Sequence, residues 1–369
     1  MRLSRLVSLM LTAGCPTVGG QAVLEGVMMR NKDMYSVAVR KPDGEIEVEI
    51  DEYHGIASGS ILMRIPFVRG IFVFIDSLAI GMKALNFSSS LYGEEDVKPT
   101  KADLFLDRIS KGHGEKVVEA ITMLISFALA IGIFVLLPYF IADVLTVYIR
   151  NESLLSLMEG IVRILIFILY ILLISRMKDI HRLFCYHGAE HKCINCIEKG
   201  RPLTVKNAMR SSRLHKRCGS SFILFVMFVS IVLFFFIRVQ SLPMRLLLRI
   251  LLIPVISGIS YEIIRLAGRS DNPIVNAISA PGLWLQRLTT KEPDETMVEV
   301  GIKAVEAVFD WKAYLKDSFG YEIDDSWLEE DSEADDDDSE DSTDEDVDID
   351  EILKEAEEED ADPAEKEMS

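Results

Sequence analysis

The chain has 369 residues, of which 49% are hydrophobic, yet its formal net charge is −19. The apolar residues gather between about residues 61 and 264 and the acidic ones at the C-terminal end, which excludes an ordinary soluble globular protein. Four of the five cysteines lie in one basic segment. This clustering excludes a secreted disulfide framework and favours reduced thiols or metal ligands in the cytoplasm.

The N-terminal part divides into a lead-in, residues 1–18, and a β-rich cytoplasmic region, residues 19–60. The apolar run in the lead-in is too short for the core of a signal peptide. In the second region, apolar and charged residues alternate on both sides of Pro42-Asp43-Gly44, a pattern that predicts a β-hairpin with one wet face. Glu25 is interpreted as a hairpin carboxylate, with a contribution to a site as the alternative.

Residues 61–116 are expected to form an amphipathic helix followed by a connector. The apolar stretch 61–87 is interrupted by charged residues too often for a clean membrane span. We therefore expect a helix that lies in the membrane interface or packs against a helical bundle. Residues 88–116 are polar and are predicted to be a flexible connector.

Residues 117–266 are predicted to form a bundle of four transmembrane helices, because each apolar stretch approaches the ~20 residues that cross a bilayer. The stretches are about Val117–Ile141, Ile161–Met177, Ser221–Ile237 and Leu246–Leu266. The fold class is therefore an α-helical multi-pass membrane protein with a small β-containing region at its N-terminal end.

The distribution of lysine and arginine predicts the orientation of the bundle. Segment 178–220 carries ten of them, whereas segment 142–160 carries one arginine. The positive-inside rule then places segment 178–220, a loop rich in histidine and cysteine, in the cytoplasm together with both chain termini. Arg238 and Arg245, in the turn 238–245, oppose this assignment without reversing it.

The C-terminal part is predicted to be cytoplasmic. Segment 267–323 contains Trp284, an aromatic side chain suited to the membrane interface, and an amphipathic helix over 295–308. Residues 324–369 are almost wholly acidic or small and polar, so they cannot form a core and should be a disordered acidic tail. We interpret the tail as solubilising rather than as a partner site.

The histidine- and cysteine-rich loop contains the motif His187-x-x-Glu190-His191. On a helix the two histidines share a face and can bind one metal ion, while Glu190 lies nearby. Glu190 could then accept the proton of a metal-bound water as a general base, which is the inverted zincin pattern. Ligands of this kind suit zinc or another late first-row divalent metal.

Two further pairs could complete a metal site, namely Cys193-x-x-Cys196 and His215-x-x-Cys218. If Cys196 and Cys218 both bind, the site is closed and structural; if two histidines and one further ligand bind, one position stays open for water. His181 is another possible ligand, although a histidine at the end of a span is more often interfacial. A basic loop that only contacts lipid headgroups, without a metal, is the alternative.

Other candidates are weaker. Glu262, in the fourth stretch, could reach the metal loop or pair with Arg265. Asp271-Asn272-Pro273 is interpreted as a turn. The sequence contains no glycine-rich phosphate loop and no serine nucleophile elbow. The basic residues cluster beside the apolar stretches, so we expect membrane lipid, and no nucleic acid, as a partner.

Five blocks spread over residues 18–310 resemble the YqhQ-type bacterial membrane proteins, a family of unknown function described as predicted metal-dependent enzymes. The blocks are GGQAVLEGVMMR, RGIFVFIDSLAIGMKAL, YHGAEHKCINC, SRLHKRCGSSF and PGLWLQRLTTKEP. The resemblance implies that the site comprises His187, Glu190, His191, Cys196, His215 and Cys218. Cys193 and Lys216 depart from the pattern, which has threonine and proline there.

Together these features predict a metal-dependent enzyme of the hydrolase type at the cytoplasmic face of the bacterial inner membrane. Glu190 would be catalytic, and the metal, zinc, would be bound by ligands drawn from His187, His191, His215, Cys218 and Cys196. The alternative is a non-catalytic membrane scaffold or assembly factor with a structural metal or none. A transporter is less favoured, because four spans with few buried charges offer no evident pathway.

Overall fold

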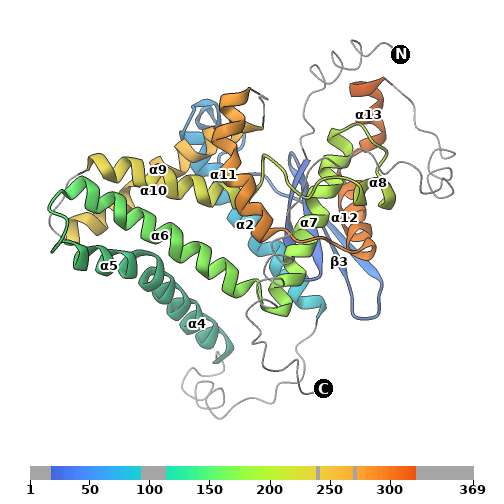
Figure 1. The fold of residues 1–369 in the computed structure, drawn as a ribbon. Coiled ribbons are helices and arrows are strands. Elements are labelled where there is room, and N and C mark those ends of the chain that lie inside the picture. Colours follow the sequence, from blue (N-terminus) through green and yellow to red (C-terminus); the bar gives the residue numbers. More distant parts are fainter. Residues whose placement is uncertain (1–17, 93–113, 238–241, 269–271, 321–369) are drawn as a thin grey trace, which may run out of the picture.

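A computed structural model describes residues 18–92, 114–237, 242–268 and 272–320. The lead-in up to residue 17, most of the expected connector, Arg238 and the predicted acidic tail lie outside these ranges. The described chain is mostly helical and contains one small antiparallel sheet. In Figure 1 a helical bundle lies on the left, the sheet and its covering helices lie on the right, and α2 and α11 lie between them.

The sheet has four strands in the order β1-β2-β3-β4, each antiparallel to its neighbour. Its strands are β1 Val18–Val23, β2 Gly26–Asn31, β3 Met34–Arg40 and β4 Ile46–Glu52. The hairpin predicted around Pro42-Asp43-Gly44 is confirmed, since β3 pairs with β4 from Arg40 opposite Ile46. Gly44 adopts φ +93°, a left-handed conformation that favours glycine in such a turn.

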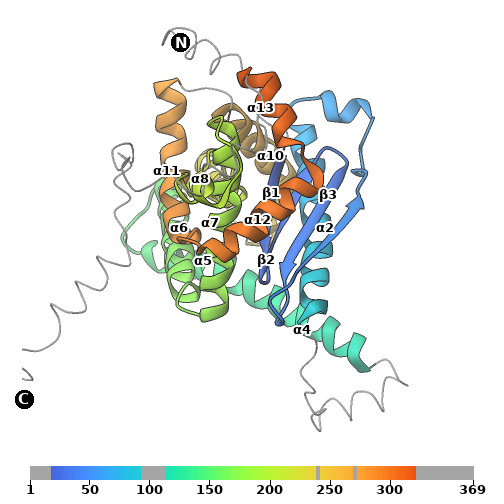
Figure 2. The ribbon, with the colours of Figure 1, turned by 90° about the vertical axis from the view of Figure 1, so that its right-hand side faces the viewer.

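Helices cover both faces of the sheet (Figure 2). Because successive side chains of a strand point to opposite faces, Val27 and Met29 pack against α7 (Lys178–Glu198) and α12 (Glu295–Val308). Met28 and Val37, on the opposite face, pack in a second core with Ile80 of α2 (Val68–Leu91). Helix α7, which carries the histidine motif, is therefore fixed on one side by the sheet.

Helix α2, preceded by the short helix η1 (Ile61–Arg64), contains most of the stretch expected to be amphipathic. Of the two expected placements, the structure shows packing against the bundle. The Arg69 guanidinium makes a bidentate ion pair with Glu262 of α10 (Leu242–Ala267). The backbones meet closely, since a Cβ on Gly258 would lie 2.4 Å from the carbonyl oxygen of Phe67.

Four helices of the described chain are long and apolar enough to cross a membrane. They are Leu124–Leu145, Ser153–Ile174, Gly219–Phe236 and Leu247–Ala267. The first runs through α4 (Gly114–Ile131), η2 (Gly132–Leu136) and α5 (Leu137–Leu145), and the next two correspond to α6 (Glu152–Ile174) and α9 (Gly219–Phe236). The predicted number is confirmed, although the first helix extends further along the chain than expected and the second begins earlier.

The first of these helices contains a π-helical turn at Gly132–Leu136, and its cause lies in the sequence. Pro138 has no backbone N–H, so it cannot donate to the carbonyl four residues earlier, on Phe134. The Nε of Arg163 in α6 donates to that carbonyl instead, at 3.1 Å. An arginine of the neighbouring helix thus satisfies the backbone group that the proline leaves open.

Segment 178–220, predicted to connect the second and third spans, is helical in its first half. Helix α7 occupies Lys178–Glu198, and the short helix α8 occupies Val205–Met209. The charged and polar residues of α7 lower its hydropathy, but the sheet and α12 bury most of its second half. The C-terminal segment is also helical, with α11 (Pro273–Thr289), α12 over the predicted residues and α13 (Trp311–Phe319).

Candidate metal centre

Three side chains converge where α7 meets the start of α9, namely His187, His191 and Cys218. One ligand atom from each lies within 4.8 Å of the other two. The two histidines are four residues apart on α7, so they share a face, and their ring centroids are 4.5 Å apart. The Nε2 of His187 lies 3.2 Å from the Sγ of Cys218.

Backbone carbonyls fix both imidazole rings. The Nδ1 of His187 lies 2.8 Å from the carbonyl oxygen of Thr289, and the Nδ1 of His191 lies 2.6 Å from that of Arg213. A carbonyl can only accept, so each Nδ1 must carry a proton and donate it. Each Nε2 is then the ring atom left to face the cluster, and once it has lost its proton it can offer a lone pair to a metal, as in histidines whose outer hydrogen bonds orient them as metal ligands.

The two carbonyls are themselves held in place by contacts between distant segments. Arg213 donates from Nη1 to the carbonyl of Thr290 at 2.9 Å, next to Thr289 at the end of α11. The buried side chain of Gln286 accepts from the N–H of His215 and donates to its carbonyl, both at 2.8 Å. The segment before Cys218 is therefore clamped to the last turn of α11.

Cys218 is the N-cap of α9, and its sulfur accepts from the N–H of Ser220. Burial alone would raise the pKa of this thiol, but His187 and His191 outweigh burial and hold the pKa well below its ordinary value. Burial likewise opposes a charge on His187, yet the Cys218 sulfur raises the pKa of His187 to about 9. The pair therefore favours a thiolate, which is the form that binds metals.

Glu190 lies beside these ligands but outside the group of three. Its side chain is only 4% exposed, and its carboxyl faces β1, since a Cβ on Gly20 would lie 3.1 Å from its Cδ. Burial raises the pKa of Glu190, while the charges of His191 and His187 oppose that rise. A buried carboxyl with a raised pKa is a candidate for proton transfer.

The structure does not bring His215 and Cys196 into the group of three. The Nε2 of His215 lies 3.2 Å from a carboxylate oxygen of Glu198, and its ring centroid is 5.7 Å from that of His191. The thiol of Cys196 donates to the carbonyl of Pro202 at 3.3 Å. Cys196 follows His187 by nine residues, which places it about 180° around the helix.

The remaining histidine and cysteine candidates also lie apart from the group. The sulfur of Cys185 lies 3.7 Å from Nδ1 of His181, which is one turn earlier in α7. Cys193 contacts the carbonyl of Val298 in α12. Burial raises the pKa of Cys185 to about 11 and that of Cys193 well above its ordinary value, so both are inert neutral thiols.

Glu25 has a role that the sequence did not reveal. Its carboxylate accepts from Nε and Nη2 of the Arg182 guanidinium and from the hydroxyl of Tyr186, the last at 3.2 Å. Both partners lie on α7, so Glu25 holds the β1–β2 turn against the helix just before His187. No local pattern could have shown this, because the partners are more than 150 residues away along the chain.

Glu262 and Asn272 have structural roles outside the metal centre. Glu262 pairs with Arg69 and also lies 3.8 Å from Arg265, so it belongs to the contact between α2 and α10. Asn272 caps α11 by accepting from the N–H of Ile274. Its neighbour Asp271 lies outside the described residues.

These features define a mostly helical protein with four membrane-compatible helices, a small sheet and a buried histidine–cysteine cluster. Residues 65–311 match the model of the family described as "Protein of unknown function (DUF1385)", and the chain belongs to this family. It is 38% identical over 293 residues to "Uncharacterized protein YqhQ" of Bacillus subtilis (strain 168), covering 78% of this chain and 91% of that protein. No solved structure matches.

The family membership confirms the resemblance to the YqhQ-type proteins. Neither description names an activity. The metal-dependent reaction implied by the resemblance therefore stays a prediction, supported by the geometry of the cluster.

We expect Gly188→Ala to weaken metal binding although it leaves every ligand in place. A Cβ on Gly188 would lie 2.1 Å from the carbonyl oxygen of Lys291, so the segment after α11 must move away from α7. That segment adjoins Thr289, which orients His187. Losing an outer hydrogen bond of this kind costs roughly 10- to 100-fold in metal affinity. The measurement is a zinc titration against a competing chelator.

Gly219→Ala is the matched control, because Gly219 also neighbours a ligand but a Cβ there meets nothing within 4 Å. Its zinc affinity should equal that of the wild type. Equal affinities for Gly188→Ala and Gly219→Ala would contradict the positioning role of Thr289.

Proposed function

We propose that this protein is a membrane-embedded metalloenzyme in which His187, His191 and Cys218 bind one zinc ion. The observation that carries the proposal is the convergence of the three ligand atoms, with both Nδ1 atoms already bonded to carbonyls. Two imidazoles and a thiolate form a ligand set that suits zinc.

The number of ligands favours catalysis. Catalytic zinc sites have three protein ligands and keep the fourth position for water, whereas structural sites are closed by four. A zinc ion held by these residues would lower the pKa of a bound water, and we assign the acceptance of its proton to Glu190, the buried carboxyl that directly precedes His191. The reaction class that fits is hydrolysis. Since Cys218 directly precedes the apolar helix α9, the substrate would be met at the membrane surface.

The membrane placement is part of this proposal. Large apolar side chains are exposed on the four long helices, among them Phe127, Leu165, Val232 and Leu251, as expected of surfaces that face lipid. The lysines and arginines of segment 178–220 favour a cytoplasmic position for α7 and the metal centre. Membrane lipid is then the immediate environment of the bundle.

A structural metal is the second candidate. The cluster joins Cys218, the residue that begins α9, to two histidines of α7, which packs on the sheet. A metal ion there would tie the bundle to the sheet region, as expected of a scaffold or assembly factor. The two candidates share the ligands and differ in the role of Glu190.

The purified protein should contain about one zinc ion per chain. His187→Ala and Cys218→Ser should each lose it, because each removes one of only three ligands. Cys196→Ser should retain it, since Cys196 bonds to the carbonyl of Pro202 instead. Metal analysis after chelation and zinc reloading measures this. A wild type without metal, or a Cys196→Ser protein that loses it, would show the ligand assignment to be wrong.

Glu190→Gln separates the enzyme from the scaffold. The variant should keep its zinc but lower the cellular function by about 100-fold or more, because glutamine cannot accept a proton. The readout is complementation of a strain that lacks the gene. An exposed carboxylate changed in the same way, Glu45→Gln, should complement fully. Full complementation by zinc-loaded Glu190→Gln would favour the structural metal.

Cysteine labelling tests the orientation. In intact spheroplasts a membrane-impermeant maleimide should label Tyr148→Cys, since Tyr148 is 81% exposed and lies between the first two long helices. It should label Lys303→Cys, on the exposed side of α12, only after lysis. The opposite pattern would place the metal centre on the outer face.

A further inference from the structure

Segment 61–67, which precedes α2, exposes an apolar surface that belongs to none of the four long helices. Ile61 is 72% exposed and Phe67 is 53% exposed. Leu62 and Ile65, between them, are exposed as well. A contiguous exposed apolar patch of this kind marks a surface that lipid or another protein covers.

A contact with α10 gives the depth of this segment in the bundle. A Cβ on Gly258 would lie 2.4 Å from the carbonyl oxygen of Phe67, so the two backbones touch. Gly258 is nine residues before Ala267, where the fourth long helix ends. At 1.5 Å per residue, Phe67 therefore lies ~13 Å from that end. It is the end beside the metal centre, because Gly268 packs against Arg217.

Helix α2 carries the chain back toward the metal-centre side. Its Gly70 packs against Tyr261 of α10, closer to the end of that helix. The ring of Phe74 then contacts Phe222, close to the start of α9, with the ring centroids 5.4 Å apart. Beyond this point α2 reaches the sheet (Figure 1). In the proposed placement, α2 therefore leaves the bilayer near Phe74.

The residues before α2 run beside it in the opposite direction. The backbone N–H of Ile56 donates to Oδ1 of Asp76, on α2, at 3.0 Å. Asp76 follows Phe67 by nine residues, which is ~13 Å along a helix. Residues 56–67 therefore cover the distance that the start of α2 covers again, and the two form a hairpin with its tip at Phe67.

The tip is a strained turn that α10 holds in place. Phe67 has φ +67°, and the N–H of Val68 donates to the carbonyl of Pro66 at 2.8 Å, which is the rarer type of γ-turn. The N–H of Phe67 donates to the carboxylate of Glu262 at 3.4 Å, and that carboxylate also pairs with Arg69. A strained turn persists where its surroundings determine it. Bonded N–H groups and paired charges are also what hydrocarbon requires.

We propose that residues 56–76 form a re-entrant hairpin, which enters the bilayer from the metal-centre side, turns at Phe67 and leaves by the same face. The exposed apolar side chains of segment 61–67 contact lipid acyl chains. Arg64 is exposed, and its long side chain reaches toward the headgroups. Because the hairpin closely follows β4, it holds the sheet at the membrane surface. The inference rests on the proposed membrane placement but not on the metal.

Cysteine protection tests the hairpin in membranes opened by lysis. Ile61→Cys and Ile65→Cys should react with a membrane-impermeant maleimide at least roughly 10-fold more slowly than Lys303→Cys, because the reactive thiolate is disfavoured in hydrocarbon. The wild-type signal is subtracted, and the four cysteines of the described chain are buried. Glu52→Cys is the matched control, since Glu52 is exposed just before the hairpin and should react as fast as Lys303→Cys.

Leu165→Cys separates this proposal from the membrane placement, because Leu165 is exposed on the second long helix. If Leu165→Cys is protected while Ile61→Cys reacts as fast as Lys303→Cys, the hairpin is wrong and the membrane placement stands. If both react fast, the membrane placement fails and the hairpin fails with it. The readout does not depend on zinc, so the metal proposal can fail independently.

Nanodiscs that hold one chain each distinguish lipid from a second copy of the protein. Protection of Ile61→Cys should persist in them, because lipid still covers the segment. Protection that is lost on dilution to one chain per nanodisc would overturn the proposal and assign the apolar patch to a contact between copies.

Discussion

Two hydrogen bonds, from the Nδ1 atoms of His187 and His191 to backbone carbonyls, are the constraint on which the histidine–cysteine cluster depends. They fix the direction of each ring, and the Nε2 of His187 lies 3.2 Å from the Cys218 sulfur as a result. Their acceptors, the carbonyls of Thr289 and Arg213, come from segments far apart in the chain. Much of the surrounding packing can be understood as support for these two carbonyls.

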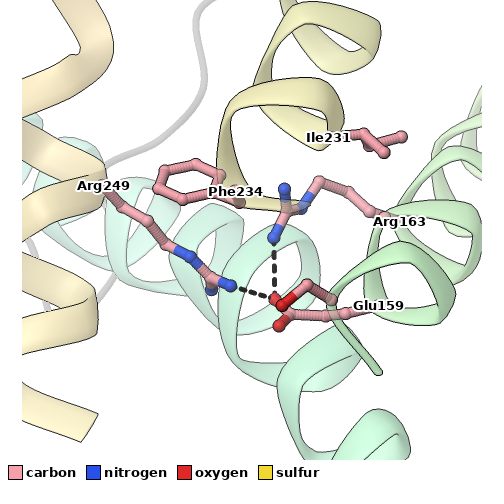
Figure 3. A pocket seen from close by; sticks show the side chains of 7 residues that line it. Glu159, Arg163, Ile231, Phe234 and Arg249 are labelled. Atoms are coloured by element: carbon pink, nitrogen blue, oxygen red, sulfur yellow. Dashed lines mark hydrogen bonds and ion pairs between the residues drawn. The ribbon is translucent and has the colours of Figure 1, made fainter. Parts of the chain in front are cut away.

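That support makes the site a junction between the two parts of the molecule. Helix α7 is held by the sheet, by α12 and by the Glu25–Arg182 pair, whereas Cys218 caps a helix of the bundle. A metal ion bound there would couple the two parts, and any loosening of the junction would weaken the site. The Arg163–Glu159–Arg249 cluster similarly joins α6 and α10 at the other end (Figure 3).

The sequence predicted the features that follow from local periodicity and missed those that depend on long-range contacts. The lengths of the apolar stretches predicted four long helices. The four-residue spacing of His187 and His191 predicted that the two side chains share one face of a helix. The choice among Cys196, His215 and Cys218 stayed open, because only the tertiary structure shows that His215 bonds to Glu198 and that Cys196 bonds to the carbonyl of Pro202. The packing of α7 on the sheet could not be predicted, because the polar composition of the helix does not show that it is buried.

X-ray absorption at the zinc edge of the purified protein tests the central claim most directly. If His187, His191 and Cys218 bind the zinc ion, one sulfur should lie about 2.3 Å from the zinc and two imidazole nitrogens about 2.0–2.1 Å from it. One further ligand should be a water oxygen. The sulfur should disappear in any metal retained by Cys218→Ser. A zinc shell without sulfur, or one with two or more sulfurs, would contradict the assignment of His187, His191 and Cys218 as the ligands.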